Sequence, residues 1–246
     1  MNWTPATIVS KKIWSEGLFT LQMAAPQITP FTPGQFLHLA MREGDEQINR
    51  PYSVASPHGE IIEFFIVRVE DGKLTPKLWG LDAGDEIEVS EKAAGSFTLA
   101  KTPDATNLWM IATGTGLAPY IAMLRTEEPW ERYQKIVVVH GVRHNSDFAY
   151  QEEFQQHQQK YGDRFSYVPV LSREDVPGTL RGRIPQVMES GSLEEAGACP
   201  ISKSESAILL CGNPAMLDEM EKRLGQREMT KHRKKAPGQI VLERYW

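Results

Sequence analysis

Hydrophobic and polar positions divide the chain into two halves with different rhythms. Up to about residue 100, short segments of partly alternating apolar and polar residues are separated by breaks rich in proline and glycine. The strands predicted here are Ala6–Trp14, Leu18–Ala24, Gln35–Arg42, Ile61–Val69 and Asp85–Glu91, with a helix-like insert at Lys73–Gly80. Short and closely spaced strands favour a small antiparallel β-barrel.

After residues 101–104, nearly continuous apolar runs alternate with helical patterns. The predicted strands are Leu108–Ala112, Ile136–His140, Phe165–Leu171, Ala207–Cys211 and Gln239–Tyr245. The predicted helices are Pro119–Arg125, Asp147–Tyr161, Ile184–Ser190 and Pro214–Leu224. Apolar strands separated by helices indicate a parallel sheet buried on both faces. We therefore predict two domains, a β-barrel over residues 1–101 and an α/β parallel-sheet nucleotide-binding domain over residues 102–246.

Composition and charge narrow the class of protein. The 246 residues are 41% hydrophobic and 24% charged, as in ordinary globular proteins. A net charge of −5 argues against a general nucleic-acid or membrane-surface binder, and no apolar run approaches the length of a membrane span. The first residues show no export signal, so we expect a cytoplasmic protein. Two cysteines are too few for a disulfide framework or an iron–sulfur cluster.

Candidate chemistry first appears in the run Arg50-Pro51-Tyr52-Ser53. On a strand, residues 50 and 52 lie on the same face. An arginine can bind a phosphate through two parallel hydrogen bonds, a tyrosine ring can stack on a flat cofactor, and the serine adds a hydroxyl. A strand end with a surface arginine and a half-buried tyrosine would explain the same residues.

Two turns in the second half resemble nucleotide-binding turns. Residues 113–119, Thr-Gly-Thr-Gly-Leu-Ala-Pro, follow an apolar strand, and glycines at such a turn let a nucleotide approach the backbone. Pro119 stands where the pattern Gly-x-Gly-x-x-Gly has its third glycine. Residues 211–216, Cys-Gly-Asn-Pro-Ala-Met, also end a strand, so Cys211 could lie at the cofactor. A tight turn and a buried structural cysteine are the alternatives.

Three arginines, Arg143, Arg173 and Arg183, follow further strands or turns of the second half, and Ser172 precedes the second of them. Guanidinium groups and a hydroxyl at one sheet edge suit a phosphate monoester such as the 2′-phosphate of NADP. We expect no acidic residue placed to hold an unphosphorylated ribose. Solvated surface arginines are the competing explanation.

Two features near the C-terminus remain. The last residues, Glu243-Arg244-Tyr245-Trp246, end in two aromatics, which suggests docking on a flat group or packing of a last strand. The basic segment Lys231–Lys235 is either a solvated face, a docking patch for an acidic partner, or a contact for an anionic cofactor group.

Taken in order, these stretches resemble the plant-type ferredoxin–NADP reductase superfamily, and most closely its bacterial ferredoxin/flavodoxin–NADP reductases. The resemblance rests on Arg50–Ser53, Gly72–Thr75, Gly114–Pro119, Cys211–Met216 and Tyr245–Trp246, and it covers nearly the whole chain. It implies FAD in the barrel, NADP(H) in the second domain, and ferredoxin or flavodoxin as a separate carrier protein. We also expect a monomer without a metal site.

The resemblance further implies roles for single residues. Arg50 would hold the FAD pyrophosphate, Tyr52 would stack on the isoalloxazine, and Ser53 would lie near flavin N5. The other implied FAD contacts are Pro51, Phe65, Ile66, Val67, Lys73, Leu74, Thr75, Thr115, Tyr245 and Trp246. The implied NADP contacts are Gly114, Gly116, Arg143, His144, Ser172, Arg173, Arg183, Gly212, Asn213 and Pro214. The residues expected to act in catalysis are Ser53, Cys211, Glu243 and Tyr245.

Plant enzymes of this family end in a tyrosine, whereas this chain has one further aromatic residue, Trp246, after Tyr245. We expect Tyr245 over the isoalloxazine and Trp246 near the adenine. The implied reaction is hydride transfer between nicotinamide C4 and flavin N5, followed by single electrons to the carrier. One alternative is an NAD(P)H–flavin reductase or diaphorase that acts on small acceptors. Another is a flavin-binding module without turnover, against which the intact Tyr52, Ser53 and Cys211 count.

Overall fold

The computed structural model describes residues 1–245, which form two compact units. The first unit combines residues 1–98 with residues 118–126, and the second combines residues 99–117 with residues 127–245. Trp246 lies outside the described residues, so its expected place near the adenine stays a prediction.

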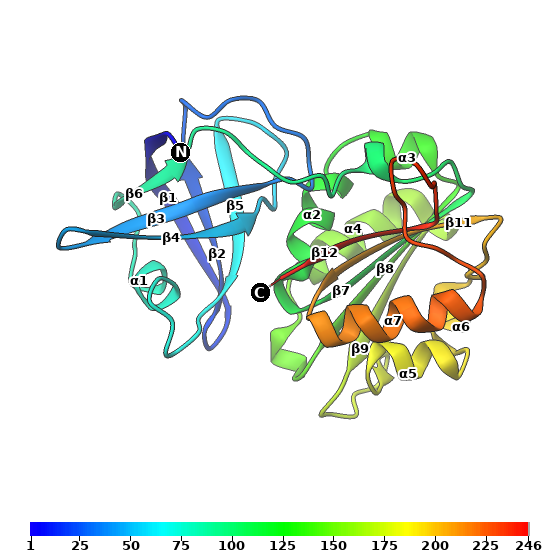
Figure 1. Cartoon of the computed structure of the whole chain (residues 1–246). Coiled ribbons are helices and arrows are strands. Elements are labelled where there is room, and N and C mark those ends of the chain that lie inside the picture. The colour runs from blue at the N-terminus through cyan, green and yellow to red at the C-terminus, as the bar shows by residue number, and fades with distance from the viewer. Residues whose placement is uncertain (246) are drawn as a thin grey trace. The chain divides into compact units, whose positions relative to one another are not determined.

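The first unit is built on a six-stranded antiparallel sheet, as predicted, with the strand order β4-β3-β6-β1-β2-β5 (Figure 1). The strands are β1 Trp3–Ser15, β2 Leu18–Ala24, β3 Phe36–Glu43, β4 Glu46–Ser53, β5 Ile61–Val67 and β6 Glu86–Ser90. Val54, just after the edge strand β4, pairs with Phe64 of the other edge strand, so the two edges of the sheet meet. This contact closes the sheet in the manner of a barrel.

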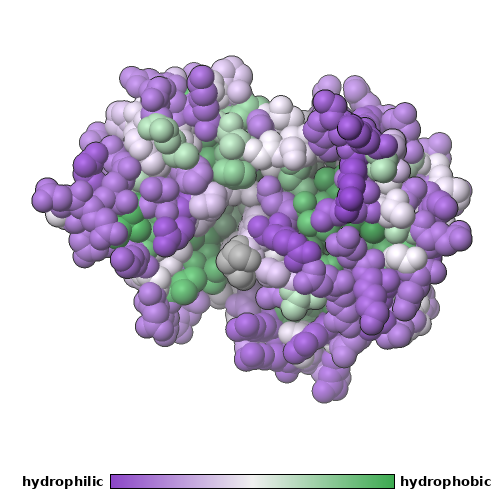
Figure 2. Space-filling model, viewed as in Figure 1, coloured by the Kyte–Doolittle hydropathy of each residue, from purple (hydrophilic) through white to green (hydrophobic). Residues whose placement is uncertain are grey.

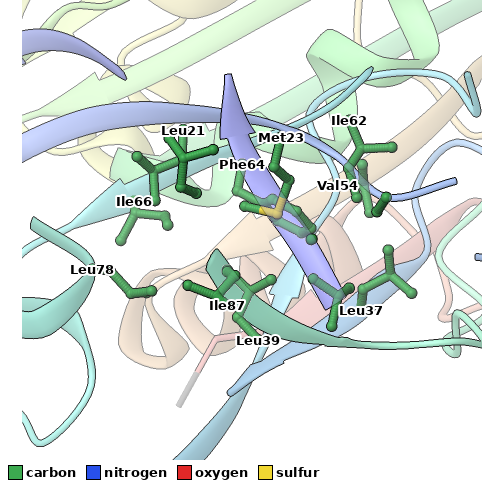
Figure 3. Packing of buried hydrophobic residues seen from close by; sticks show 14 of the residues in the cluster. Leu21, Met23, Leu37, Leu39, Val54, Ile62, Phe64, Ile66, Leu78 and Ile87 are labelled. Carbon is green, nitrogen blue, oxygen red and sulfur yellow. The ribbon is translucent and has the colours of Figure 1, made fainter. Parts of the chain in front are cut away.

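Apolar side chains from alternate strand positions fill the interior of this unit. Leu21, Met23, Leu37 and Phe64 belong to one cluster of fully buried residues (Figure 3). The helix α1 (Thr75–Trp79) adds Leu78 to the same cluster. Burial of this apolar surface is the main stabilising term of such a unit.

Lys11 of β1 holds the C-terminal end of α1. Its Nζ donates to the carbonyls of Trp79 at 3.1 Å and Leu81 at 2.6 Å, and it contacts the Asp82 carboxylate at 2.9 Å. The last carbonyls of a helix have no partner within the helix, and a lysine is well suited to bind them.

The strand β4 was predicted only in part, through its residues 50–53. It begins at Glu46 and pairs with β3 in an antiparallel hairpin whose register places Leu39 opposite Arg50. Three of its eight residues are exposed, and Pro51 lies within it, so the sequence lacks the apolar alternation of a central strand. Proline is tolerated here because β4 is an edge strand.

The second unit contains a parallel sheet, again as predicted; its six strands, including the unpredicted β10, have the order β10-β9-β8-β7-β11-β12 (Figure 1). Its strands are β7 Asn107–Thr113, β8 Lys135–Val142, β9 Phe165–Leu171, β10 Leu180–Arg181, β11 Ser206–Gly212 and β12 Ile240–Arg244. Because all pairings are parallel, the carboxyl ends of these strands lie at one edge of the sheet.

Helices cover both faces of this sheet. One apolar cluster joins alternate residues of the central strands to α5 (Ile184–Glu189), α6 (Ser192–Gly197) and α7 (Pro214–Gln226). The helix α4 (Gln151–Tyr161) packs elsewhere on β9, where its Phe154 ring stacks on Tyr167 with 4.3 Å between the ring centroids. Alongside α4, Trp130 of α3 (Glu128–Arg132) stacks on Tyr161.

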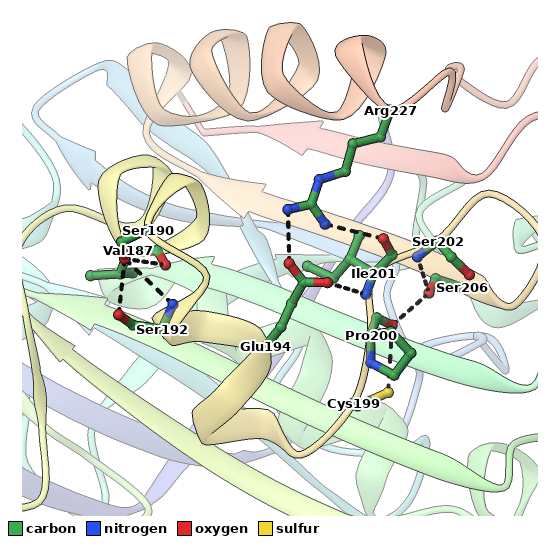
Figure 4. A network of polar contacts seen from close by, with 10 residues as sticks. All are labelled: Val187, Ser190, Ser192, Glu194, Cys199, Pro200, Ile201, Ser202, Ser206 and Arg227. Atoms are coloured by element: carbon green, nitrogen blue, oxygen red, sulfur yellow. Dashed lines mark hydrogen bonds and ion pairs between the residues drawn. The ribbon is translucent and has the colours of Figure 1, made fainter.

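A polar network anchors the segment between α6 and β11. Glu194 accepts hydrogen bonds from Arg227 Nη2 at 2.8 Å and from the backbone N–H of Ile201 at 2.7 Å (Figure 4). Arg227 Nη1 donates in turn to the Ile201 carbonyl at 3.1 Å. The approach to β11, the strand that carries Cys211, is therefore held by charged side chains as well as by apolar packing.

The helix predicted over Asp147–Tyr161 begins later than expected, at Gln151. Asp147 ends a short 3-10 turn, and Tyr150 has a left-handed φ of 59° that interrupts the helical backbone. The helix predicted at Pro119–Arg125 is α2 (Ala118–Leu124), whose seven residues are all buried and belong to the first unit. No helix within residues 1–245 is long and apolar enough to cross a membrane.

Candidate functional site

The first candidate site lies on β4. Arg50 and Tyr52 stand two residues apart on this strand, so their side chains share one face of the hairpin, as predicted. The exposed Arg50 guanidinium donates to the Asn49 carbonyl at 2.7 Å. Tyr52 is half-buried against the apolar cluster; burial raises its pKa to about 12, and the charge of Arg50 opposes this rise. A neutral phenol ring and a guanidinium group therefore stand side by side.

Six of the other FAD contacts implied by the resemblance lie on β5 and at the start of α1. Phe65 and Ile66 are buried, whereas Val67 is exposed. Thr75 Oγ1 accepts from the backbone N–H of Val69 at 2.9 Å and donates to the Val69 carbonyl at 3.3 Å. This side chain therefore fastens the loop between β5 and α1. Lys73 is exposed and pairs with Glu46 at 3.7 Å, while Leu74 belongs to the core.

The second candidate site lies at the carboxyl edge of the parallel sheet, where two turns interlock. A Cβ atom on Gly116 would stand 2.7 Å from the carbonyl oxygen of Cys211, so only glycine fits at this position. The Thr113 hydroxyl accepts a hydrogen bond from the backbone N–H of Asn213 at 2.9 Å. The turns after β7 and β11, which the sequence presented separately, are thus one structure.

Helix α7 begins at the second of these turns. Asn213 Oδ1 accepts from the backbone N–H groups of Ala215 at 2.9 Å and Met216 at 3.3 Å, and Pro214 occupies the first turn of the helix. Both residues therefore have a structural role as cap and first helical residue, a role that sequence analysis did not assign to them. Gly212 has a φ of 124°, which disfavours any residue with a Cβ atom.

Three residues predicted to act in catalysis lie together: Cys211 on β11, Glu243 on β12 and Tyr245 just beyond β12. Cys211 pairs in register with Glu243, and the Tyr245 N–H donates to the Gly212 carbonyl at 3.2 Å. The Cys211 side chain is fully buried. Burial raises the pKa of its thiol well above the ordinary value, Glu243 raises it further, and a hydrogen bond with Tyr245 lowers it. The Cys211 thiol therefore stays protonated. Ser53, the fourth residue predicted to act in catalysis, belongs to the first unit.

The predicted phosphate-binding residues follow three adjacent strands of the sheet. Ser172 donates to the Val142 carbonyl through its backbone N–H at 3.1 Å and its hydroxyl at 3.2 Å. The Arg173 N–H donates to the Arg143 carbonyl at 3.2 Å, so these two arginines are backbone neighbours. Arg183 follows β10, and the guanidinium-bearing side chains of all three arginines are exposed.

An acidic residue, Glu174, also stands at this edge, directly after Arg173. The two carboxylate oxygens of Glu174 bind His144 Nδ1 at 2.8 Å and the backbone N–H of Asn145 at 2.7 Å. The hydrogen bond from the Asn145 N–H lowers the pKa of the Glu174 carboxyl most, and the hydrogen bond with His144 lowers it further. Glu174 is thus engaged in holding the loop that carries Arg143 and His144. Its role was not visible in the sequence because both partners come from another strand end.

Sequence analysis also missed His140, which lies on β8 behind the turn at residues 113–117. Its Nε2 is 3.1 Å from the Gly114 carbonyl oxygen, and its Nδ1 is 3.4 Å from the Tyr167 hydroxyl. The side chain is fully buried, and this burial lowers its pKa to about 4, with the Gly114 hydrogen bond opposing the shift. The only signal in the sequence is a histidine within the apolar run Ile136–His140.

The basic segment Lys231–Lys235 forms a turn before β12. The backbone of Arg233 exchanges two hydrogen bonds of 3.0 Å with Ala236, and His232 N–H donates to the Ile240 carbonyl at 2.7 Å. Arg233, Lys234 and Lys235 are exposed. Hydrophilic residues dominate the visible surface (Figure 2), so exposure alone does not mark a site. What distinguishes these residues is that they carry one sign of charge.

Comparison with known proteins adds to this geometry. The family model of the oxidoreductase FAD-binding domain matches residues 5–97, and that of the oxidoreductase NAD-binding domain matches residues 110–222. The chain is 40% identical over 247 residues to a flavodoxin/ferredoxin–NADP reductase of Shigella flexneri, covering 100% of this chain and 99% of the relative. The corresponding protein of Escherichia coli strain K12 is 39% identical with the same coverage.

A solved structure shows the same architecture. A ferredoxin NADP+ reductase from Neisseria gonorrhoeae, crystallised with bound FAD and NADP, superposes with a TM-score of 0.94. It is 28% identical in sequence, and the match covers 100% of both chains.

Proposed function

The chain belongs to the family of flavodoxin/ferredoxin–NADP reductases, and from this membership we infer that it transfers electrons between NADP(H) and ferredoxin or flavodoxin through FAD. The observation that carries this inference is the full-length match, which extends through both cofactor-binding domains. When bound, FAD exchanges a hydride with NADP(H) and passes single electrons to a carrier.

The residues of the first unit suit FAD. The exposed Arg50 guanidinium presents N–H groups that match an anionic pyrophosphate, and the neutral Tyr52 ring beside it can stack on a flat ring system. We assign the edge of β4 to the flavin on this basis, with Ser53, Phe65–Val67 and Lys73–Thr75 completing the site. The fastened loop at Thr75 keeps these segments in place.

The residues of the second unit suit NADP(H). Gly114, with its positive φ, and Gly116, packed closely on Cys211, present no side chain that would block a dinucleotide at this turn. The exposed Arg143, Arg173 and Arg183 offer the donors that a 2′-phosphate requires. We assign Cys211, Glu243 and Tyr245 to the nicotinamide end. The buried and protonated thiol there can give a hydrogen bond without carrying charge.

The carrier is proposed to dock at the basic segment Lys231–Lys235, since ferredoxins and flavodoxins are typically acidic. We further propose a monomer that works in the cytoplasm. The two thiols of Cys199 and Cys211 are unpaired in residues 1–245, as suits a reducing compartment.

The function is tested by purifying the protein with its flavin and mixing it anaerobically with NADPH in a stopped-flow instrument. We expect the yellow flavin to bleach, and the reduced protein then to reduce added ferredoxin or flavodoxin. Rapid bleaching followed by transfer only to ferricyanide or free flavin would favour a diaphorase. A flavin that NADPH leaves oxidised would contradict both enzymatic functions.

A further inference from the structure

His140 is a buried titratable side chain that the proposed reaction does not use. It lies at the end of β8, and its neighbours in register are Ala112 of β7 and Pro169 of β9. Two polar groups contact its ring, the Gly114 carbonyl and the Tyr167 hydroxyl, and the Phe148 ring meets it edge-on with 5.7 Å between centroids. A buried imidazole with a hydrogen-bond partner on each nitrogen has a defined orientation, unlike a side chain that only packs in the core.

The two contacts determine which nitrogen carries the hydrogen. A carbonyl oxygen can only accept, so Nε2 must be the donor to Gly114. In a neutral imidazole the other nitrogen is then an acceptor, and the Tyr167 hydroxyl can donate to it. A depressed pKa agrees with a ring that remains neutral throughout the physiological range. Apart from Tyr167, no titratable side chain within residues 1–245 has a recorded contact with this ring.

The carbonyl that His140 binds belongs to the first residue of the glycine turn. Gly114 has a left-handed φ of 53°. The residue before it is tied to Asn213 through the Thr113 hydroxyl, and Gly116 packs against Cys211. His140 therefore supplies a further tie to residues 113–117 from the neighbouring strand β8. Its loss would leave the Gly114 carbonyl without this partner.

We propose that His140 is a positioning residue for nucleotide binding, which holds the Gly114 carbonyl through Nε2–H and so keeps the turn at residues 113–117 in the shape that admits NADP(H). The proposal rests on the proposed NADP(H) function of that turn. His140 acts through Gly114 and does not itself contact the nucleotide. A histidine that merely filled the core would have no such effect on affinity.

Two amide substitutions separate these roles. In His140→Gln the side-chain amide nitrogen can reach the place of Nε2 and donate to Gly114. In His140→Asn the shorter side chain places its amide near Nδ1 and cannot. Both are polar and uncharged, so they match in all but reach. The affinity of the FAD-loaded protein for NADP+ is measured by flavin difference spectra, with FAD content and thermal unfolding recorded for each variant.

We expect His140→Asn to weaken NADP+ binding by about tenfold, because a buried acceptor loses its donor, and His140→Gln to restore it to within about threefold of the wild type. Equal affinity in all three proteins, or equal loss in both variants, would overturn the proposal. The failure of wild-type protein to bind NADP+ or to be reduced by NADPH would instead overturn the proposed function.

Nitrogen NMR of the wild-type protein tests the proposal without a substitution that could disturb folding. We expect the His140 ring to show a protonated Nε2 and an unprotonated Nδ1 between pH 8 and pH 6. We also expect NADP+ to shift the Nε2 resonance. Protonation at Nδ1, or a ring that NADP+ leaves unchanged, contradicts the positioning role.

Discussion

At the scale of single residues, burial sets the protonation of the side chains behind the nucleotide-binding turn. Cys211 and His140 are both fully buried, and both are kept in their neutral forms. The neighbouring strand ends carry the exposed Arg143, Arg173 and Arg183. In the proposed site, neutral groups would thus support the backbone and charged groups would meet the ligand.

The low pKa of His140 makes the fold sensitive to acid. The native state holds this ring neutral down to a pKa of about 4, whereas an unfolded histidine titrates near 6.5. Between these values the unfolded chain binds more protons, so the contribution to stability is complete above pH 6.5 and is lost as the pH falls towards 4. The loss amounts to about 3 kcal/mol. Urea unfolding at pH 7.5, 6.0 and 5.0 should show this slope in the wild type and a flatter one in His140→Gln.

The arginines at the sheet edge predict a preference for NADPH. Replacing Arg173 with alanine should weaken NADPH binding by roughly ten- to a hundredfold, since a charge-assisted bond to phosphate contributes about 1.5–3 kcal/mol. NADH, which has no 2′-phosphate, should bind almost as before. Arg181→Ala is the matched control, because this exposed arginine is paired with Asp175 at 3.2 Å. Equal losses for both nucleotides on Arg173→Ala would remove the assignment.

The aromatic side chain of Tyr245 is expected to occupy the place that the nicotinamide ring takes for hydride transfer. Nicotinamide must then displace it, and stacking worth about 0.5–1.5 kcal/mol permits this. Tyr245→Ser should tighten nucleotide binding, slow product release and relax the preference for NADPH. Charge-transfer absorbance and pre-steady-state reduction by both nucleotides measure these effects. If all of them stay at wild-type values, Tyr245 serves only to pack the end of β12.

At the scale of elements, the sequence predicts those strands and helices whose pattern of buried positions appears as a pattern of apolar residues. The parallel strands stand out because both faces are covered, and β1 shows alternation at Thr4, Ala6 and Ile8. The strand β4 does not show such alternation, since it is an exposed edge strand that contains a proline. The late start of α4 follows from the backbone of Tyr150, which no sequence pattern marks.

The same distinction applies to the site. Glycines, arginines and the aromatic end could be proposed from the sequence because their residue types carry the chemistry. Glu174 and His140 were missed because their roles arise from partners on other strands: Asn145 and His144 for the first, the Gly114 carbonyl for the second. The register between neighbouring parallel strands creates these contacts, and that register is not written in any local segment.

The end of helix α1 offers a stability test at this scale. Lys11→Met removes the donor to the Trp79 and Leu81 carbonyls and should lower the free energy of unfolding by about 1–3 kcal/mol. The ion pair with the highly exposed Asp82 contributes little to this loss in the free energy of unfolding. Lys101→Met, at an exposed position, is the control. Equal urea midpoints for the two variants would show that Lys11 does not hold the helix.

At the scale of the whole molecule, a chain of net charge −5 carries a segment of five consecutive basic or potentially basic residues. Such a local excess can steer an acidic carrier even when the overall charge repels it. Replacing Lys234 and Lys235 with glutamine should slow carrier reduction at low salt and flatten its decline with rising salt, because exposed charges are screened beyond about 10 Å at 0.1 M.

The control replaces Lys101 and Lys222, which are also exposed, so that the net charge changes equally. Stopped-flow reduction of ferredoxin and flavodoxin across a salt series gives the measurement. A wild-type rate that does not respond to salt would rule out docking at the basic segment, and loss of FAD from the variant would point to a cofactor contact instead.

The first unit is not one continuous stretch of chain, because it takes α2 from beyond the first strand of the parallel sheet. Arg125, just after this helix, donates to the Ala55 carbonyl at 3.0 Å and lies 3.4 Å from the buried Glu63 carboxylate. During synthesis on the ribosome, the barrel can therefore bury α2 only after residue 126 has been added, and by then β7 has already been synthesised. Maturation of the two units is interleaved rather than sequential, and a fragment that stops at residue 101 would leave the nascent barrel with an uncovered apolar surface for chaperones to bind.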